Sequence, residues 1–114
     1  MDSIPRMIFE LDVFARNHIT EGLRLRGHDG VGLGHGVLLR NMDLDGSPLS
    51  VVAQRAGLTR QAIAKTAADL TRLGYVRTVT SPDDARVKIV RLTARGAKLV
   101  VDVIELYDEI EAVY

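Results

Sequence analysis

The chain has no cysteine and no tryptophan, and only two phenylalanines and three tyrosines occur among its 114 residues. Without cysteine it can form no disulfide, no thiolate zinc site and no cysteine-based nucleophile or redox sensor. No apolar run approaches the roughly 20 residues that a membrane-spanning helix needs. The first residues, MDSIPRMIFELD, lack the basic segment that precedes the apolar stretch of a signal peptide. We therefore expect a cytoplasmic protein with no membrane partner.

The composition is that of a globular domain. Hydrophobic residues make up 46% and charged residues 26% of the sequence, which argues against a disordered tail or a coiled-coil rod. A chain of this length can bury one modest core but not two. We therefore expect a single domain over residues 1–114.

Charge is segregated along the chain, although 15 basic and 15 acidic residues cancel to a net charge of zero. Residues 49–96 hold nine basic and three acidic residues, whereas residues 97–114 hold one basic and five acidic residues. Residues 1–48 hold five basic and seven acidic residues. A basic middle between acidic ends is typical of a protein that meets a polyanion with one surface. A solvated helical face of uneven charge would give the same pattern.

The N-terminal part of the chain predicts a long helix followed by a flexible connection. Apolar residues recur at close to the helical period over residues 4–26, and Ser3 is placed to cap this helix. Five glycines in residues 27–36 end it. A short helix at about residues 34–43 and a turn at residues 43–48, with the sequence DLDGSP, are expected next.

Two further helices, at about residues 49–56 and 60–73, are joined by a tight link. Gly57 ends the first because glycine accepts a positive φ, and Thr59 is placed to cap the second. The second helix has an apolar stripe at helical spacing, formed by Ile63, Ala67, Leu70 and Leu73. Its opposite face carries Arg60, Gln61, Ala64, Lys65 and Ala68.

A β-hairpin and a last helix complete the pattern. Residues 75–81 and 87–92 are rich in β-forming residues and flank a polar turn that contains Pro82. Thr93 is placed to cap a final helix over residues 94–114, whose apolar stripe is wider than a small domain can cover by itself.

A helix, a turn containing glycine and a second helix are typical of a helix-turn-helix, in which the second helix enters the major groove of DNA. Arginine and lysine can read guanine, and glutamine can read adenine. A small residue such as Ala64 allows close approach or contacts a thymine methyl group. An ordinary helical hairpin is the alternative at this point.

The basic hairpin directly after the helix pair favours a winged helix. Residues 49–96 (LSVVAQRAGLTRQAIAKTAADLTRLGYVRTVTSPDDARVKIVRLTARG) resemble the MarR family of bacterial transcriptional regulators. The resemblance rests on the helix pair, on Gly74-Tyr75-Val76, and on the wing SPDDAR followed by VRLTARG. It implies a mainly α fold with a small β-hairpin wing, in which residues 31–93 form the DNA-binding winged helix.

The resemblance also implies roles for individual residues. Arg86 matches the wing arginine that enters the minor groove, and Asp84 matches the acid that holds it. A surface salt bridge that only stabilises the turn is the alternative. The implied DNA-binding set is Thr59, Arg60, Gln61, Ala64, Lys65, Asp84, Arg86 and Lys88.

The family resemblance further implies a homodimer that binds a pseudo-palindromic operator in double-stranded DNA, most often as a repressor. Residues 1–30 and 94–114 would form the dimerisation helices, in keeping with their unpartnered apolar surfaces. Family members usually continue with a further helix, whereas this sequence ends at Tyr114. A short family member, a truncated chain or a reduced interface would each account for this difference.

Many family members bind a small, often aromatic, anionic effector, and the residues implied here are His18, Leu25, His28, Val31 and His35. A packed or merely exposed histidine is the more common case. His28 and His35 with Asp29 and Asp43 would be an alternative metal site. We expect no metal, no cofactor and no enzymatic activity, because neither H-E-x-x-H, a P-loop, nor a Ser/His/Asp set occurs. A winged helix that binds an acidic protein instead of DNA is the main alternative function.

Overall fold

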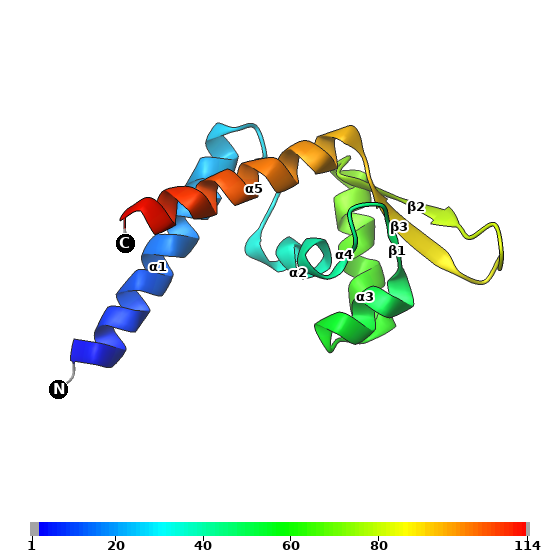
Figure 1. Cartoon of the computed structure of the whole chain (residues 1–114), viewed down its shortest axis with the longest axis horizontal. Helices are drawn as coiled ribbons and strands as arrows, with labels where there is room; N and C mark the ends of the chain where they lie inside the picture. Colours follow the sequence, from blue (N-terminus) through cyan, green and yellow to red (C-terminus); the bar gives the residue numbers. More distant parts are fainter. Residues whose placement is uncertain (1–2, 114) are drawn as a thin grey trace. The chain divides into compact units, whose positions relative to one another are not determined.

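The computed structural model describes residues 3–113, except for the side chains of residues 3–5, 33 and 113. The described residues fall into two compact units, one formed by residues up to 33 and from 101 onward, the other by residues 34–100. The predicted C-terminal dimerisation helix begins at residue 94, and a helix does begin there. Its first residues, 94–100, nevertheless belong to the second unit. The elements of the chain, drawn in Figure 1, are in order α1 (Ser3–Leu25), η1 (Leu33–His35), α2 (Gly36–Asn41), β1 (Ser47–Pro48), α3 (Leu49–Ala56), α4 (Arg60–Arg72), β2 (Val76–Thr80), β3 (Lys88–Leu92) and α5 (Ala94–Val113).

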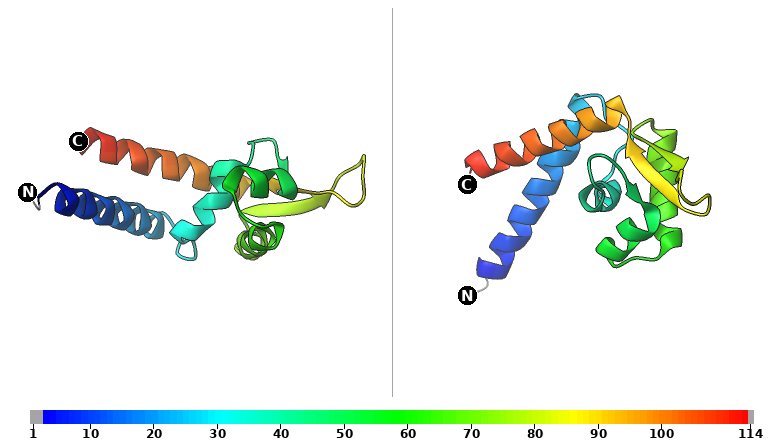
Figure 2. Two further views of the ribbon diagram at one scale, coloured as in Figure 1. Left: turned by 90° about the horizontal axis from the view of Figure 1, so that it is seen from below. Right: turned by 45° about the vertical axis from the view of Figure 1, so that its right-hand side comes forward.

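The second unit contains a helix pair and a three-stranded antiparallel sheet. The strands lie in the order β1-β3-β2, and the hairpin of β2 and β3 extends beyond the helices (Figure 2). Its core consists of aliphatic side chains from the helices and the inner face of the sheet together with one tyrosine: Leu38, Val52, Ala53, Ile63, Ala67, Leu70, Tyr75, Val76, Val90 and Leu99. This arrangement is a winged helix, and the predicted mainly α fold with a hairpin wing is confirmed.

Local chemistry explains where these elements begin and end. Gly57, at φ 68°, and Gly74, at φ 88°, adopt the left-handed conformation that ends α3 and α4. Thr59 caps α4, because its Oγ1 accepts a hydrogen bond from the N–H of Ala62 at 3.1 Å. The predicted helix 49–56 and both strands of the hairpin are confirmed, although each strand is shorter than predicted.

The strand β1 departs from the prediction, in which residues 43–48 form only a turn. The turn exists and Gly46 adopts φ 109°, but Ser47 and Pro48 then pair with Val90 and Ile89 of β3. Two residues carry no alternating pattern, and proline is uncommon in strands, so no strand signal is present in the sequence here.

The first turn of α5 is fixed against the base of the hairpin. Thr93 caps the helix as predicted, since its Oγ1 accepts from the N–H of Gly96 at 3.1 Å. The Thr93 hydroxyl donates to the carbonyl of Gly74 at 2.6 Å, and the Thr93 N–H donates to the carbonyl of Tyr75 at 3.1 Å. A Cβ at position 96 would collide with the Tyr75 carbonyl oxygen, so only glycine permits this approach.

The first unit consists of α1, the connection after it and the C-terminal part of α5. The end of α1 is closed by Gly27, at φ 89°, and by a bond from the N–H of His28 to the carbonyl of Leu23 at 2.8 Å. The predicted N-cap, the Ser3 side chain, lies outside the described residues. Ile19, Leu23 and Leu106 are buried in this unit, and α1 and α5 approach closely where Gly22 faces Leu106.

The first unit also leaves large apolar side chains exposed. On α1 they are Met7, Ile8, Phe9, Leu11, Val13, Phe14 and Leu25, and on α5 they are Val101, Ile104 and Tyr107. Such a set is larger than the scattered apolar residues of an ordinary surface. The predicted excess of apolar surface on these two helices is therefore confirmed.

Candidate nucleic-acid interface

The helix α4 has one buried and one exposed face. Ile63 and Leu70 are fully buried and Ala67 is 3% exposed, which fixes the helix in the core, whereas Leu73 at its end is half-buried. On the opposite side Arg60, Gln61, Ala64, Lys65 and Ala68 are all exposed, as predicted. The N-terminal half of α4 therefore presents two cations, an amide and small side chains that let the helix backbone approach a partner closely.

The wing carries an arginine held by an aspartate. The guanidinium of Arg86 donates from Nε to Oδ1 of Asp84 at 3.2 Å and from Nη2 to Oδ2 at 3.3 Å. Asp84 Oδ1 also accepts from the N–H of Arg86 at 3.0 Å. The side-chain bonds, followed by the backbone bond, hold the pKa of the Asp84 carboxyl below its ordinary value. The pair predicted from the sequence is thus formed, and the Arg86 side chain is 90% exposed.

A hollow in the surface brings the wing and the helices together. It is lined by the first residues of α3 and α4 and by the wing: Leu49, Ser50, Arg60, Asp84, Arg86, Val87 and Lys88. Four residues of the predicted set, Arg60, Asp84, Arg86 and Lys88, therefore share one site. Lys88 is oriented across the hairpin, where its Nζ donates to Thr80 Oγ1 at 3.0 Å.

The remaining residues of the predicted set belong to α4 or cap it, and they do not line this hollow. They are Gln61, Ala64 and Lys65 on the exposed face and Thr59, whose hydroxyl oxygen is used as the cap. Sequence reasoning missed Leu49 and Ser50. The sequence did indicate their position, because they follow Pro48 at the start of a predicted helix, where free backbone N–H groups favour anions.

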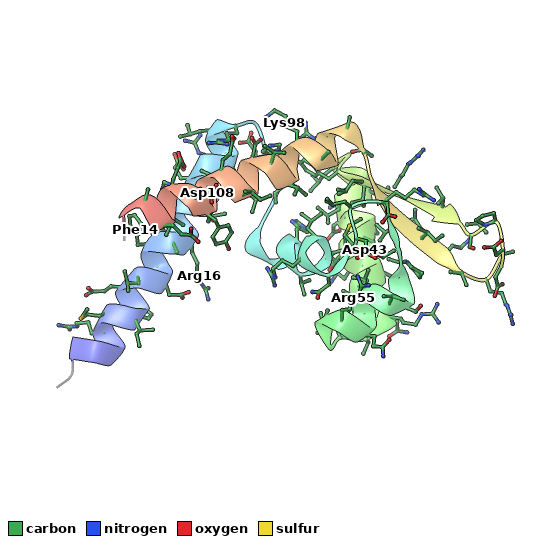
Figure 3. All side chains as sticks on the ribbon, in the orientation of Figure 1. Phe14, Arg16, Asp43, Arg55, Lys98 and Asp108 are labelled. Carbon is green, nitrogen blue, oxygen red and sulfur yellow. The ribbon has the colours of Figure 1, made fainter. Side chains whose placement is uncertain are left out.

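One basic residue near the helix pair is engaged by an acid. Arg55 of α3 donates from Nη1 to the Asn41 carbonyl and to Asp43 Oδ1, both at 3.1 Å. Asp43 lies in the turn that follows α2, and both residues are labelled in Figure 3. The bonds from Arg55 lower the pKa of the Asp43 carboxyl. This pair ties the end of α2 to α3, so Arg55 acts in positioning the helices.

The candidate effector residues are divided between the two units and have different partners. In the first unit, His18 Nε2 lies 3.1 Å from Glu109 Oε2, Leu25 is 71% exposed, and the buried His28 lies 2.7 Å from Asp102 Oδ2. Val31, in the connection, is half-buried. In the second unit, His35 Nε2 lies 3.9 Å from Asp69 Oδ2. His28 is therefore a packed histidine with an acidic partner, which the sequence could not locate 74 residues away.

The alternative metal site finds no support in the part of the chain that the structure describes. There, no cluster of three or more histidine, cysteine, aspartate or glutamate side chains is arranged to hold a metal ion. None of the helices, over the residues described, is long and apolar enough to cross a membrane.

The winged helix is similar in sequence to a known protein family. Residues 35–87, which include the helix pair and the wing, match the sequence model described as the MarR family. This segment is similar in sequence to the winged helix of that family. No curated protein matches the chain in sequence.

Solved structures share the fold of nearly the whole chain. A MarR transcriptional regulator from Methanosarcina mazei Go1 has a TM-score of 0.73 at 23% identity, covering 99% of this chain and 80% of its own. A mutant of MepR from S. aureus, solved with an oligodeoxyribonucleotide, has a TM-score of 0.73 at 16% identity, covering 97% of this chain and 80% of its own. CouR from Rhodococcus jostii RHA1, solved with p-coumaroyl-CoA, has a TM-score of 0.71 at 21% identity, covering 99% of this chain and 78% of its own. The chain therefore has the fold of MarR-family transcriptional regulators.

Proposed function

We propose that this protein is a homodimeric, sequence-specific regulator that binds double-stranded DNA and acts as a repressor. The observation that carries the proposal is the convergence of Arg60, Arg86 and Lys88 on one open hollow between the start of α4 and the wing. Phosphate oxygens are the natural partners of such a cationic surface, and they supply most of the affinity of DNA-binding proteins. The DNA bound to the fold neighbour MepR supports the same interpretation.

In this proposal α4 lies in the major groove and the wing, residues 82–87, reaches the adjacent minor groove. Arg60, Gln61 and Lys65 are exposed on the N-terminal half of α4, where side chains of a recognition helix reach base edges. Arg86 enters the minor groove with its guanidinium already oriented by Asp84, and it reads groove width more than base identity.

The exposed apolar residues of α1 and α5 support the homodimer. Met7, Phe9 and Ile104 are each more than half exposed, which is costly for a lone chain in water. A second copy would cover them, and two winged helices would then contact two half-sites about one helical turn apart. Sedimentation of the free protein tests this part separately from DNA binding.

A small anionic effector that changes operator affinity is a finer part of the proposal. The fold neighbour CouR holds p-coumaroyl-CoA, and of the implied effector residues His18 and Leu25 have accessible surface on α1. His28 is buried on Asp102 and would act only by supporting its neighbours. Thermal shift against a panel of aromatic acids and their thioesters tests this, with His18→Ala as the variant expected to lose the response.

A titration with DNA separates the proposal from a protein-interaction module. A labelled duplex, chosen by selection from a random pool, is titrated with the wild-type chain and with Gln61→Ala and Arg86→Ala. We expect Gln61→Ala to change the preferred bases and Arg86→Ala to weaken binding. Absence of binding by the folded wild-type chain would instead favour the protein-interaction module.

A further inference from the structure

The hollow between α4 and the wing contains one serine among its charged side chains. Ser50 of α3 lines this hollow and is exposed, and within the described part of the chain its hydroxyl group forms no hydrogen bond. Ser47, earlier in the same segment, is 1% exposed, and its Oγ accepts a hydrogen bond from the Asp43 N–H at 2.8 Å. Ser50 is therefore the serine of this segment whose Oγ an enzyme in solution can reach.

The hollow has a formal charge of +2, because its three cations, Arg60, Arg86 and Lys88, outnumber its one acid by two. That acid, Asp84, is paired with Arg86. Arg60 and Lys88 form no ion pair with any carboxylate that the structure describes. A phosphoryl group on a serine carries a charge of about −1.5 to −2 at pH 7 and three acceptor oxygens. One such group on Ser50 would cancel the whole charge of the hollow.

We propose that Ser50 is a phosphorylation site whose modification switches off DNA binding. This inference rests on the proposed DNA-binding function and adds a means of regulating it. A protein serine kinase transfers the γ-phosphoryl group of ATP: a bond forms between Ser50 Oγ and the γ-phosphorus, and the bond from that phosphorus to the bridging oxygen of ADP breaks. The hydroxyl proton passes to the general base of the kinase, and ADP leaves.

The phosphoryl group would compete with DNA through both its charge and its attachment. Arg60 and Lys88 donate charge-assisted hydrogen bonds to phosphate oxygens, whether these belong to DNA or to phosphoserine. A group attached to Ser50 remains at the hollow, so it meets these cations at a high effective concentration. It also places negative charge where the DNA backbone would lie. Phosphorylation therefore both occupies the cations and repels the DNA.

The first test uses the full chain with phosphoserine inserted at position 50 during translation. If phosphorylation neutralises two cations, the log–log salt slope for the operator should fall by about 1.8 for every winged helix bound. The affinity at 0.15 M salt should fall by roughly 30-fold, the value that this slope gives. Removal of the phosphoryl group by a phosphatase should restore binding. Phosphoserine in place of Gln54, which is exposed on α3 but does not line the hollow, is the charge-matched control and should cost less than about fivefold.

A second measurement examines the hollow without DNA. Because nearby cations favour the dianion, phosphoserine at position 50 should titrate, by phosphorus NMR, at a lower pH in the folded chain than in the unfolded chain. Arg60→Ala should move this titration back toward that of the unfolded chain. Protein serine kinases, each incubated with the folded chain and ATP, should label Ser50 and leave Ser47 unlabelled in peptide mass spectrometry.

The inference is overturned if no kinase labels Ser50, or if the phosphorylated chain binds the operator like the unmodified chain. It is also overturned if the Gln54 control loses as much affinity, or if the phosphoserine titrates alike in the folded and unfolded chains. If the folded, unmodified chain binds no duplex while the phosphorus titration is shifted, the proposed function fails and the phosphate-binding hollow at Ser50 stands.

Discussion

Asp84 holds Arg86 with both carboxylate oxygens, at 3.2 Å and 3.3 Å, while Oδ1 also accepts the Arg86 backbone N–H. The two residues are separated by one position in the wing turn, which is closed by a bond from the Val87 N–H to the Asp84 carbonyl at 3.0 Å. The guanidinium is thus oriented before any partner arrives, although its side chain is almost fully exposed. Less rotational freedom remains to be lost on binding.

Removing the orienting acid should reduce discrimination more than affinity. Asp84→Asn keeps the shape of the side chain but cannot hold the guanidinium fork with two oxygens. We expect operator binding to weaken several-fold, while binding to random DNA is unchanged or tighter because the variant has one negative charge fewer near the phosphates. Competition titrations with both DNAs measure the ratio, and an unchanged ratio would argue against the orienting role. Asp83→Asn, in the same exposed turn, is the matched control.

Removing the arginine itself should have a larger effect. We expect Arg86→Ala to weaken operator binding by roughly 5- to 150-fold, which corresponds to about 1–3 kcal/mol. Arg86→Lys keeps the charge but not the planar fork, so its affinity should lie between those of the wild type and Arg86→Ala. Equal affinities of wild type and Arg86→Ala, by fluorescence anisotropy, would remove the wing from the interface.

The ion pair should also be visible in the titration of Asp84. Because Arg86 lowers the pKa of this carboxyl in the folded chain, the pair stabilises the fold above the unfolded pKa of about 4 and is lost as pH falls through the folded pKa. Binding between pH 5 and 8 should not depend on this group. The side-chain carboxyl resonance, followed by NMR, should titrate at a higher pH in Arg86→Ala. Identical titrations in both proteins would show that the pair is not formed in solution.

The cap of α4 offers a test of stability. Thr59→Ala removes the oxygen that accepts the Ala62 N–H and should lower the free energy of unfolding by about 1 kcal/mol. Thr66→Ala is the control, because its hydroxyl only donates to the Ala62 carbonyl within the helix. Its effect should stay below about 0.5 kcal/mol. Denaturant titrations compare the two, and equal losses would contradict the capping role.

The close approach of α5 to the base of the wing should make Gly96 intolerant of substitution. Gly96→Ala forces a methyl group against the Tyr75 backbone carbonyl, which we expect to destabilise the fold by about 1–3 kcal/mol. Gly32→Ala is the matched control, since a Cβ at position 32 meets nothing within 4 Å. Thermal melts measure both, and a neutral Gly96→Ala would show that this junction can readjust.

The parts of the fold that were predictable are those determined by short-range chemistry. Helix periodicity, the glycines at positions 57 and 74, and the caps Thr59 and Thr93 all act within a few residues, and each lies where the sequence predicts it. The wing pair was equally local, because Asp84 and Arg86 are two positions apart. A family resemblance, and not periodicity, supplied the role of that pair.

The parts that were missed depend on contacts between distant segments. The two-residue strand β1 exists only because β3 lies beside it, and Asp102, the partner of His28, comes from another helix. No local pattern could have indicated these two features.

Selection of bound duplexes from a random pool, with the folded wild-type chain as bait, is the decisive test of sequence-specific DNA binding by α4 and the wing. We expect enrichment of a pseudo-palindromic sequence whose half-sites are centred about one helical turn apart, as two copies of α4 would require. A pool that stays random after repeated rounds would contradict sequence-specific recognition by this surface.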